Sequence, residues 1–286
     1  MKRMFLDSGA FSAKSQGTPI DLNEYMKFIK KNKDQISHYA NLDVIGDARA
    51  SWENQRIMEA EGLTPLPVFH MEDDFKYLYE CLMYDYFCLG GMAGESSVAR
   101  IAFLDRCWEI ICDSKDNLPI SKVHGFGMSS TKLICRYPWY SVDSSSWVQY
   151  GLYGMILIPR RVLGVPDFTT SPVKVFVSSV SPRKSEEGKH FDNLTVNERH
   201  YVLEFLVEKK IELGMSEFKN VAKGYSLRDN EKFVNKEKTK VEEIIHPGVC
   251  NNGDHRDLLN YKYFMDLAAS QPEYPWAYKT KNRRLF

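Results

Sequence analysis

The sequence predicts an α/β protein built on parallel strands. Two observations support this prediction: short apolar runs recur through the first half of the chain, and amphipathic stretches with helical periodicity lie between them. Strands that alternate with helices in this way form βαβ units, whose strands run parallel. Six such runs before residue 145 fit either a (β/α) barrel or a doubly wound sheet.

The expected strands are six apolar runs: 4–7, 39–44, 66–70, 86–90, 122–127 and 139–143. The clearest helical stretches between them are "DLNEYMKFIKKN" (21–32), "ASWENQRIMEAEG" (50–62), "DDFKYLYECLMY" (73–84) and "SVARIAFLDRCWEIICDSK" (97–115). Two later β-rich runs, 154–159 and 173–179, bring the expected strands to eight. Residues 1–190 are therefore expected to form the barrel domain.

Residues 191–286 are expected to form a helical extension packed on the barrel. The stretch 194–214 has the pattern of an amphipathic helix, with Thr195 as its N-cap and Gly214 as its stop. Residues 219–240 hold six lysines and one arginine against three acids. Such a run is usually a solvated surface, and contact with phosphates is the alternative.

Composition excludes some classes of protein. The 286 residues are 43% hydrophobic and 27% charged, with a formal net charge of zero, so any nucleic-acid contact must depend on local patches. No stretch approaches the apolar length of a membrane span, and no signal peptide is evident. The six cysteines lack metal-site spacing and are expected to be buried reduced thiols. A cytoplasmic protein without membrane contact is expected.

Polar or glycine residues follow nearly every expected strand. They are Asp7, Asp43, His70, "GGMAGE" (90–95), "HGFG" (124–127) and Asp143. Taken singly, each is more often a helix cap, a turn residue or a hydrogen-bonded histidine. In a parallel barrel, however, the carboxyl ends of the strands meet on one face, where active sites form. The recurrence of such residues therefore predicts a site there.

Four segments resemble motifs of the tRNA-guanine transglycosylase family, in the family's order. They are "DSGAF" (7–11), "LGGMAGE" (89–95), "HGFG" (124–127) and "VDSSSW" (142–147). The resemblance is closest to the compact branch of phages and bacteria that inserts 7-deazaguanine bases into DNA. It implies a TIM-like (β/α)8 barrel that exchanges a guanine base without a cofactor.

The resemblance also implies roles for individual residues. Asp143 matches the nucleophile that attacks C1′ of the sugar, and Asp7 matches the general acid/base. Phe11 matches an aromatic residue that stacks on the base, and Asp43 matches the acid that accepts hydrogen bonds from it. His70 stands where the family commonly has glutamine. The other residues expected around the base are Gly90, Gly91, Met92, His124 and Gly125.

The chain departs from the family pattern in two respects. It has no C-x-C-x2-C zinc motif, and His246, Cys250 and His255 are a poor substitute set, so no metal is expected. The family barrel begins two strands before its Asp-Ser-Gly-Gly motif, yet Asp7 lies near residue 1. We therefore expect runs 154–159 and 173–179 to close the barrel in permuted order.

The expected partners are DNA, with its target guanine flipped out, and a free 7-deazaguanine base. Phosphate contacts are expected from basic residues after the two closing strands, namely Arg160, Arg161, Arg183 and Lys184. DNA is favoured because the zinc region and accessory domains with which the tRNA enzymes grip RNA are not evident. A tRNA-guanine transglycosylase, a base hydrolase and a non-catalytic nucleic-acid-binding relative remain alternatives, and the oligomeric state is left open.

Overall fold

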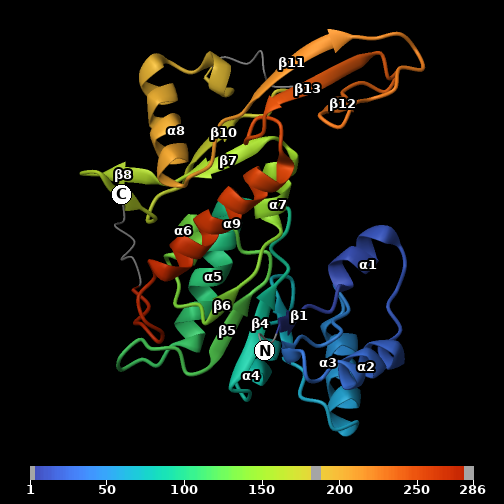
Figure 1. Ribbon diagram of the computed structural model, residues 1–286. Coiled ribbons are helices and arrows are strands. Elements are labelled where there is room, and N and C mark those ends of the chain that lie inside the picture. The colour runs from blue at the N-terminus through green and yellow to red at the C-terminus, as the bar shows by residue number, and fades with distance from the viewer. Residues whose placement is uncertain (1–3, 182–187, 280–286) are drawn as a thin grey trace. The chain divides into compact units, whose positions relative to one another are not determined.

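The structure, a computed structural model, describes residues 4–181 and 188–279 and shows a mixed α/β fold with parallel strands (Figure 1). The described chain divides into two compact units. Unit 1 comprises residues 4–144 and 272–279, and unit 2 comprises residues 145–271. The chain thus changes units at residue 144, well before the boundary expected at 190.

Unit 1 contains six parallel strands that follow one another in space as they do in sequence. They are β1 (Met4–Leu6), β2 (Ile36–Tyr39), β3 (Val68–His70), β4 (Tyr86–Gly90), β5 (Lys122–Gly125) and β6 (Ser141–Val142). β1 pairs with β2, and β3 to β6 form a four-stranded sheet. The bridge from Ala40 to Leu66 continues the parallel pairing from the end of β2 to the start of β3. The parallel strands of unit 1 thus follow one another without a reversal of order.

Helices connect these strands, and the sequence determines where several of them begin. They are α1 (Ala10–Gln16), α2 (Leu22–Lys31), α3 (Ala48–Ala60), α4 (Lys76–Cys81), α5 (Ser97–Ile111) and α6 (Thr131–Ile134). Asp21, Asp47 and Ser96 cap α2, α3 and α5 by accepting a backbone N–H three residues ahead. Every residue of β4 is buried, as a parallel strand covered on both faces requires.

Unit 2 is built mainly on antiparallel pairs. Its elements are α7 (Ser146–Leu152), β7 (Met155–Ile158), β8 (Arg160–Val162), β9 (Val165–Asp167), β10 (Val173–Phe176), the 3-10 turn η1 (Phe191–Asn193), α8 (Val196–Glu208), β11 (Met215–Asn220), β12 (Glu231–Phe233), β13 (Lys240–His246) and α9 (Gly253–Ala269). Its core joins β7, β10, α8 and α9 through residues such as Ile156, Val175, Phe205 and Leu259.

The expected closure of the barrel by runs 154–159 and 173–179 is wrong. These runs form β7 and β10, which pair antiparallel with each other, whereas closure requires parallel pairing with β6 and β1. The chain between β7 and β10 is occupied by the β8–β9 hairpin. Because no long helix lies between β7 and β10, the chain has no crossover that would make them parallel. No closed barrel is present among the described residues.

The C-terminal region is also not purely helical. Besides α8 and α9 it holds a three-stranded antiparallel sheet in the order β11-β13-β12. Thr195 does cap α8, in a capping box with Glu198, but the helix ends at Glu208 rather than at Gly214. Gly214 has a positive φ and packs against Gly248, where an added Cβ would lie 2.8 Å from a backbone nitrogen. Of the helices in the described residues, none is long and apolar enough to cross a membrane.

Candidate active site

The carboxyl ends of the strands of unit 1 present a row of polar groups. Asp7 follows β1, Asp43 lies three residues beyond the Ala40 bridge after β2, His70 ends β3, and Asp143 follows β6. Because parallel strands end at the same edge of their sheet, these side chains share one rim. These four side chains thus lie at the carboxyl ends of the parallel strands of unit 1.

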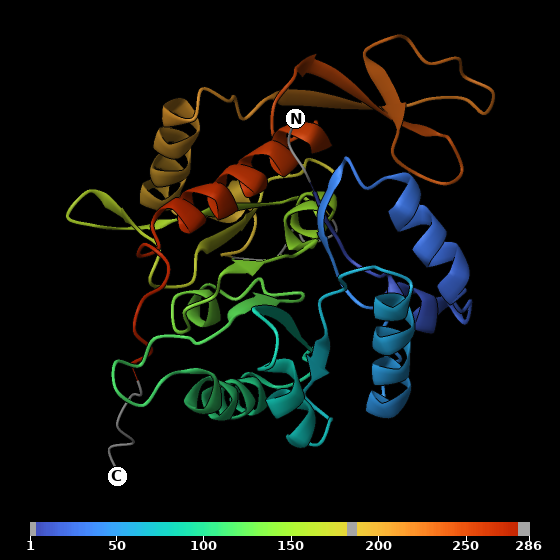
Figure 2. The ribbon, with the colours of Figure 1, turned by 90° about the horizontal axis from the view of Figure 1, so that it is seen from below.

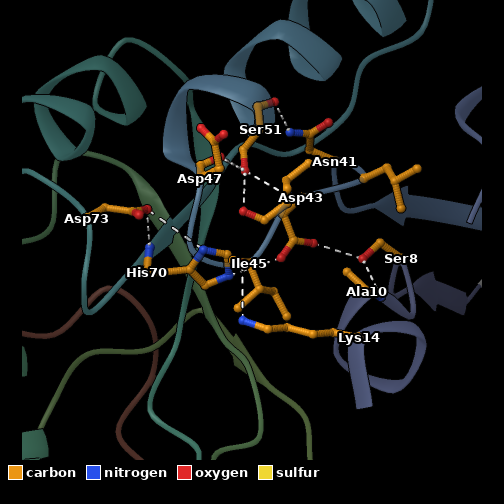
Figure 3. A network of polar contacts seen from close by, with 12 residues as sticks. Ser8, Ala10, Lys14, Asn41, Asp43, Ile45, Asp47, Ser51, His70 and Asp73 are labelled. Atoms are coloured by element: carbon orange, nitrogen blue, oxygen red, sulfur yellow. Dashed lines mark hydrogen bonds and ion pairs between the residues drawn. The ribbon is translucent and has the colours of Figure 1, made fainter. Parts of the chain in front are cut away.

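Asp43 and His70 form the most tightly connected part of this rim (Figure 3). Nε2 of His70 lies 3.0 Å from Oδ2 of Asp43, and both side chains are 8% exposed. The Ser8 hydroxyl donates to Oδ1 of Asp43 at 2.9 Å. Asp73 accepts the backbone N–H of His70 at 2.9 Å and lies 3.8 Å from its Nδ1. His70 is therefore held between two carboxylates.

This arrangement favours the charged form of His70. Burial by itself lowers the pKa of the imidazole, but the hydrogen bond to Asp43 and the charges of Asp43 and Asp73 outweigh it, so the pKa is raised. Burial has the opposite effect on the carboxyl group of Asp73, whose pKa it raises. The two ring nitrogens of His70 face the carboxylates of Asp43 and Asp73. His70 therefore helps to hold the Asp43 side chain in its orientation.

The backbone at Gly90, the last residue of β4, and at Gly91 passes close to His70. A Cβ on Gly90 would lie 3.0 Å from Cδ2 of the His70 ring, and a Cβ on Gly91 would lie 2.8 Å from the backbone nitrogen of Met71. Gly91 also has a φ of +76°. Glycine at these two positions is therefore needed for β4 to approach the end of β3, whether or not a ligand also binds there. Met92, the next residue, is buried.

Asp143 is a half-exposed carboxylate fixed by backbone and side-chain neighbours. Its Oδ1 accepts the N–H of Gly127 at 2.6 Å and lies 3.9 Å from Nε2 of His124. Partial burial raises the pKa of Asp143; the Gly127 hydrogen bond opposes this, and the negative charge of Asp7 adds to it. Both described contacts engage Oδ1.

Asp7 lies close enough to Asp43 and Asp143 for their charges to interact. Partial burial raises the pKa of Asp7. The hydrogen bond that Asp7 accepts from the Gly9 N–H opposes this shift, and the negative charge of Asp43 adds to it. Phe11, on α1, has 63% of its surface exposed. An exposed aromatic ring on the helix that directly follows Asp7 can take up a planar ligand.

A chain of hydrogen bonds lies behind Asp143. The Tyr86 hydroxyl, the Ser141 hydroxyl and Nδ1 of His124 are linked by two contacts of 2.6 Å. Burial lowers the pKa of His124 to about 4, so its ring is neutral. Nε2 of His124 is buried without a hydrogen-bond partner and faces Asp143. If Ser141 donates to Nδ1, Nε2 carries the proton and its N–H dipole favours the nearby carboxylate.

His124 and Gly125 lie at the wall of the rim. The His124 ring stacks on Phe5 with centroids 4.1 Å apart. A Cβ on Gly125 would lie 2.9 Å from the Trp139 ring, so glycine is needed there for packing.

Several residues of the rim were not predicted from the sequence. They are Ser8, Asp73, Gly127 and Ser141. Ser141 could have been found by strand periodicity, since it lies two residues before Asp143 in the expected strand 139–143. Asp73 could have been found as an acid just beyond the end of β3.

The basic residues predicted to contact phosphates lie outside the described part of unit 1. Arg160 and Arg161 lie on β8 of unit 2, and Arg183 and Lys184 lie outside the described residues. Across residues 4–181 and 188–279, no group of His, Cys, Asp and Glu side chains is arranged to hold a metal ion. Comparison with family models, curated proteins and solved structures found no match to the sequence.

Proposed function

We propose that this protein is a DNA-guanine transglycosylase, which replaces guanine in DNA by a 7-deazaguanine base. The observation that supports the proposal most is the pair Asp7 and Asp143, which follow the first and last strands of one parallel series and interact through their charges. The choice of DNA over tRNA depends on the sequence alone.

In the proposed mechanism Asp143 is the nucleophile. Its Oδ1 is held by the Gly127 amide, so Oδ2 is the oxygen that would attack C1′ of the deoxyribose. The bond from C1′ to guanine N9 breaks, and a covalent aspartyl-sugar ester forms. The incoming base then attacks C1′ from the opposite side and releases Asp143 as a carboxylate.

Asp7 would move the protons of this exchange. Its raised pKa favours the protonated form that can donate to the departing guanine, and the resulting carboxylate can accept a proton from the incoming base. Phe11 is available to stack on the base. Each oxygen of Asp43 already accepts one hydrogen bond, from Ser8 or His70, and retains capacity for a second from the base.

The test is incorporation of a labelled 7-deazaguanine base into duplex DNA and into bulk tRNA, measured side by side. We expect label in DNA, and we expect Asp143→Asn and Asp7→Asn to reduce it by about three orders of magnitude or more. Only Asp143→Asn should also abolish a covalent protein–DNA adduct trapped under denaturing conditions. Asp34→Asn, an exposed carboxylate before the amino end of β2, is the matched control.

Each other outcome has a definite meaning. Label in tRNA alone would contradict the choice of DNA and leave the chemistry intact. Exchange at the normal rate by Asp143→Asn would refute the assignment of the nucleophile. Absence of label from both polymers would favour a non-catalytic role.

A further inference from the structure

His124, on β5, has a ring nitrogen that the described residues leave without a hydrogen-bond partner. The side chain is 2% exposed, and its buried Nε2 faces Oδ1 of Asp143 at 3.9 Å. A buried polar atom without a partner destabilises a fold, so its presence requires an explanation. The stacking of the ring on Phe5 is not one, because a ring without polar atoms would stack there as well. The position of Nε2 beside the candidate nucleophile is.

Three adjacent strands of unit 1 bring together the groups behind this ring (Figure 2). β4, β5 and β6 pair in that order and carry Tyr86, His124 and Ser141, and Ser141 lies opposite His124 in the register. The Tyr86 hydroxyl lies 2.6 Å from Oγ of Ser141, which lies 2.6 Å from Nδ1 of His124. The three side chains therefore form one chain of hydrogen bonds that ends at Nδ1.

One direction of this chain uses every proton. Burial raises the pKa of Tyr86, so its hydroxyl stays protonated and donates to Ser141. Ser141 then donates to Nδ1, and the proton of the neutral His124 ring lies on Nε2. In the opposite direction the Tyr86 proton would have no acceptor among the described residues, and the Nε2 lone pair would face a carboxylate. The chain therefore selects the Nε2–H tautomer.

We propose that His124 is a positioning residue whose Nε2–H holds Oδ1 of Asp143, and that Ser141 and Tyr86 fix the tautomer that presents this proton. The inference rests on the proposed function, in which Asp143 is the nucleophile. The distance of 3.9 Å exceeds hydrogen-bond length, and such contacts are often long before substrate binds and tighten when it does. The Gly127 amide is already on Oδ1, so a second donor there leaves Oδ2 for attack.

A donor at Oδ1 favours the second half of the proposed exchange. In the first half Oδ2 bonds to C1′, the bond from C1′ to guanine N9 breaks, and Oδ1 becomes the carbonyl oxygen of an ester. In the second half the incoming base bonds to C1′ and its proton passes to Asp7, while the bond from C1′ to Oδ2 breaks and Asp143 leaves as a carboxylate. An N–H group stabilises this carboxylate more than the neutral ester. Without the His124 donor, release should slow and the ester should accumulate.

The titratable groups around Asp143 supply no positive charge that could replace this donor. Asp7, after β1, raises the pKa of Asp143 through its negative charge. Cys88, on β4, is a thiol whose pKa burial raises well above its usual value, so it is uncharged. His124 is itself neutral, since burial lowers its pKa to about 4. In the described chain the Asp143 carboxylate therefore depends on N–H dipoles, including those of Gly127 and His124.

The test compares His124→Phe with His124→Gln. Phenylalanine keeps a ring for Phe5 but has no donor, whereas glutamine loses the ring and can place an N–H near the position of Nε2. With duplex DNA and a labelled 7-deazaguanine base, we expect His124→Phe to lower turnover by about tenfold or more and to raise the fraction of protein trapped as covalent adduct. His124→Gln should keep more turnover and accumulate less adduct. The reverse order would show that His124 only packs against Phe5.

Ser141→Ala tests the relay without altering His124. It should produce the same two changes to a smaller extent, and Ser114→Ala, which removes an exposed hydroxyl between α5 and β5, is the matched control. Nitrogen-15 magnetic resonance of the histidine rings checks the tautomer in the free protein. We expect the His124 proton on Nε2 in the parent chain and a mixture of tautomers in Ser141→Ala.

A carbon-13 titration of the Asp143 carboxyl group gives a second readout that does not need catalysis. Loss of an N–H donor disfavours the charged form, so His124→Phe should move the midpoint to higher pH by about half a unit or more. A proton on Nδ1 in the parent chain, an unchanged midpoint, or equal turnover of His124→Phe and an active parent chain would overturn the proposal. The expected tautomer and midpoint in a chain that exchanges no base would retain the contact between His124 and Asp143 and reject the transglycosylase.

Discussion

At the scale of single residues, the candidate nucleophile reduces the stability of the folded chain. The pKa of Asp143 is raised above its ordinary value of 3.8. A carboxyl group with a raised pKa binds its proton more tightly in the folded state. The free energy of unfolding therefore falls as pH rises from the unfolded pKa through the folded one, and the full cost is present at neutral pH.

We accordingly expect Asp143→Asn to raise the free energy of unfolding at pH 7. The gain should be at most about 1 kcal/mol, because the side chain keeps much of its contact with solvent. Asparagine retains the oxygen that accepts the Gly127 N–H. Urea titrations at pH 7 and pH 3 measure the effect, which should be absent at pH 3, with Asp34→Asn as control. An equal gain at both pH values would contradict the electrostatic explanation.

The predicted residues of the rim are polar groups that directly follow strands, and their position can be read from the alternation of apolar runs. Asp7, His70 and Asp143 lie at or directly after the ends of β1, β3 and β6, as that pattern placed them, whereas Asp43 lies four residues beyond the end of β2. Their partners were harder to predict. Both oxygens of Asp43 are engaged because the side chains of Ser8 and His70 point toward it, and the period of a single sequence does not encode those directions.

At the scale of elements, the turn after β4 shows why two glycines follow a buried strand. Gly91 and Gly94 both have positive φ, at +76° and +84°. A Cβ on Gly91 would meet the backbone of Met71, whereas a Cβ on Gly94 would meet nothing within 4 Å. The first glycine is required by conformation and space, and the second by conformation alone.

Gly91→Ala is therefore expected to destabilise the chain by about 1–3 kcal/mol more than Gly94→Ala. Both substitutions place a side chain at positive φ, which is strained. Only Gly91→Ala must also displace the segment that carries His70. Chemical denaturation of the two variants measures the difference. Equal destabilisation would show that the β3 end moves aside easily and that His70 is less firmly held than its contacts indicate.

Strand prediction was most accurate for fully buried elements. The run 86–90 is β4 itself, because five consecutive buried residues leave a clear apolar signal. The run 39–44 was placed too late, since β2 is Ile36–Tyr39 and has exposed polar residues in its middle. The short helix α1 was missed because its residues lack an apolar period.

At the scale of the whole molecule, the sequence predicted the parallel half and not the antiparallel half. An apolar run has the same period whether its neighbour is parallel or antiparallel, so β7 and β10 resembled barrel strands. The connection between two strands is a stronger guide to their pairing, because parallel strands need a long crossover, usually a helix. The return of residues 272–279 to unit 1 carries no local signal at all.

That returning segment is anchored by Tyr278. Its hydroxyl donates to Oδ1 of Asp105 at 3.0 Å, its N–H donates to the Asn117 carbonyl, and its side chain is buried beside Tyr137. In unit 2, Asn260 is wholly buried and holds α9 to β7 by accepting the Leu157 N–H at 2.9 Å. Each unit therefore has a buried polar side chain that hydrogen-bonds to residues of the same unit.

Because each unit has its own core and anchor, we expect calorimetry to resolve two unfolding transitions, each sensitive to one substitution. Tyr278→Ala should destabilise unit 1 by about 3 kcal/mol and lower one transition by several degrees. Asn260→Ala, which leaves the N–H of Leu157 and other buried groups without their partner, should lower the other. A single transition that moves with both substitutions would show that the two units unfold together, and the insertion of residues 145–271 would then be a matter of chain path and not of independent stability.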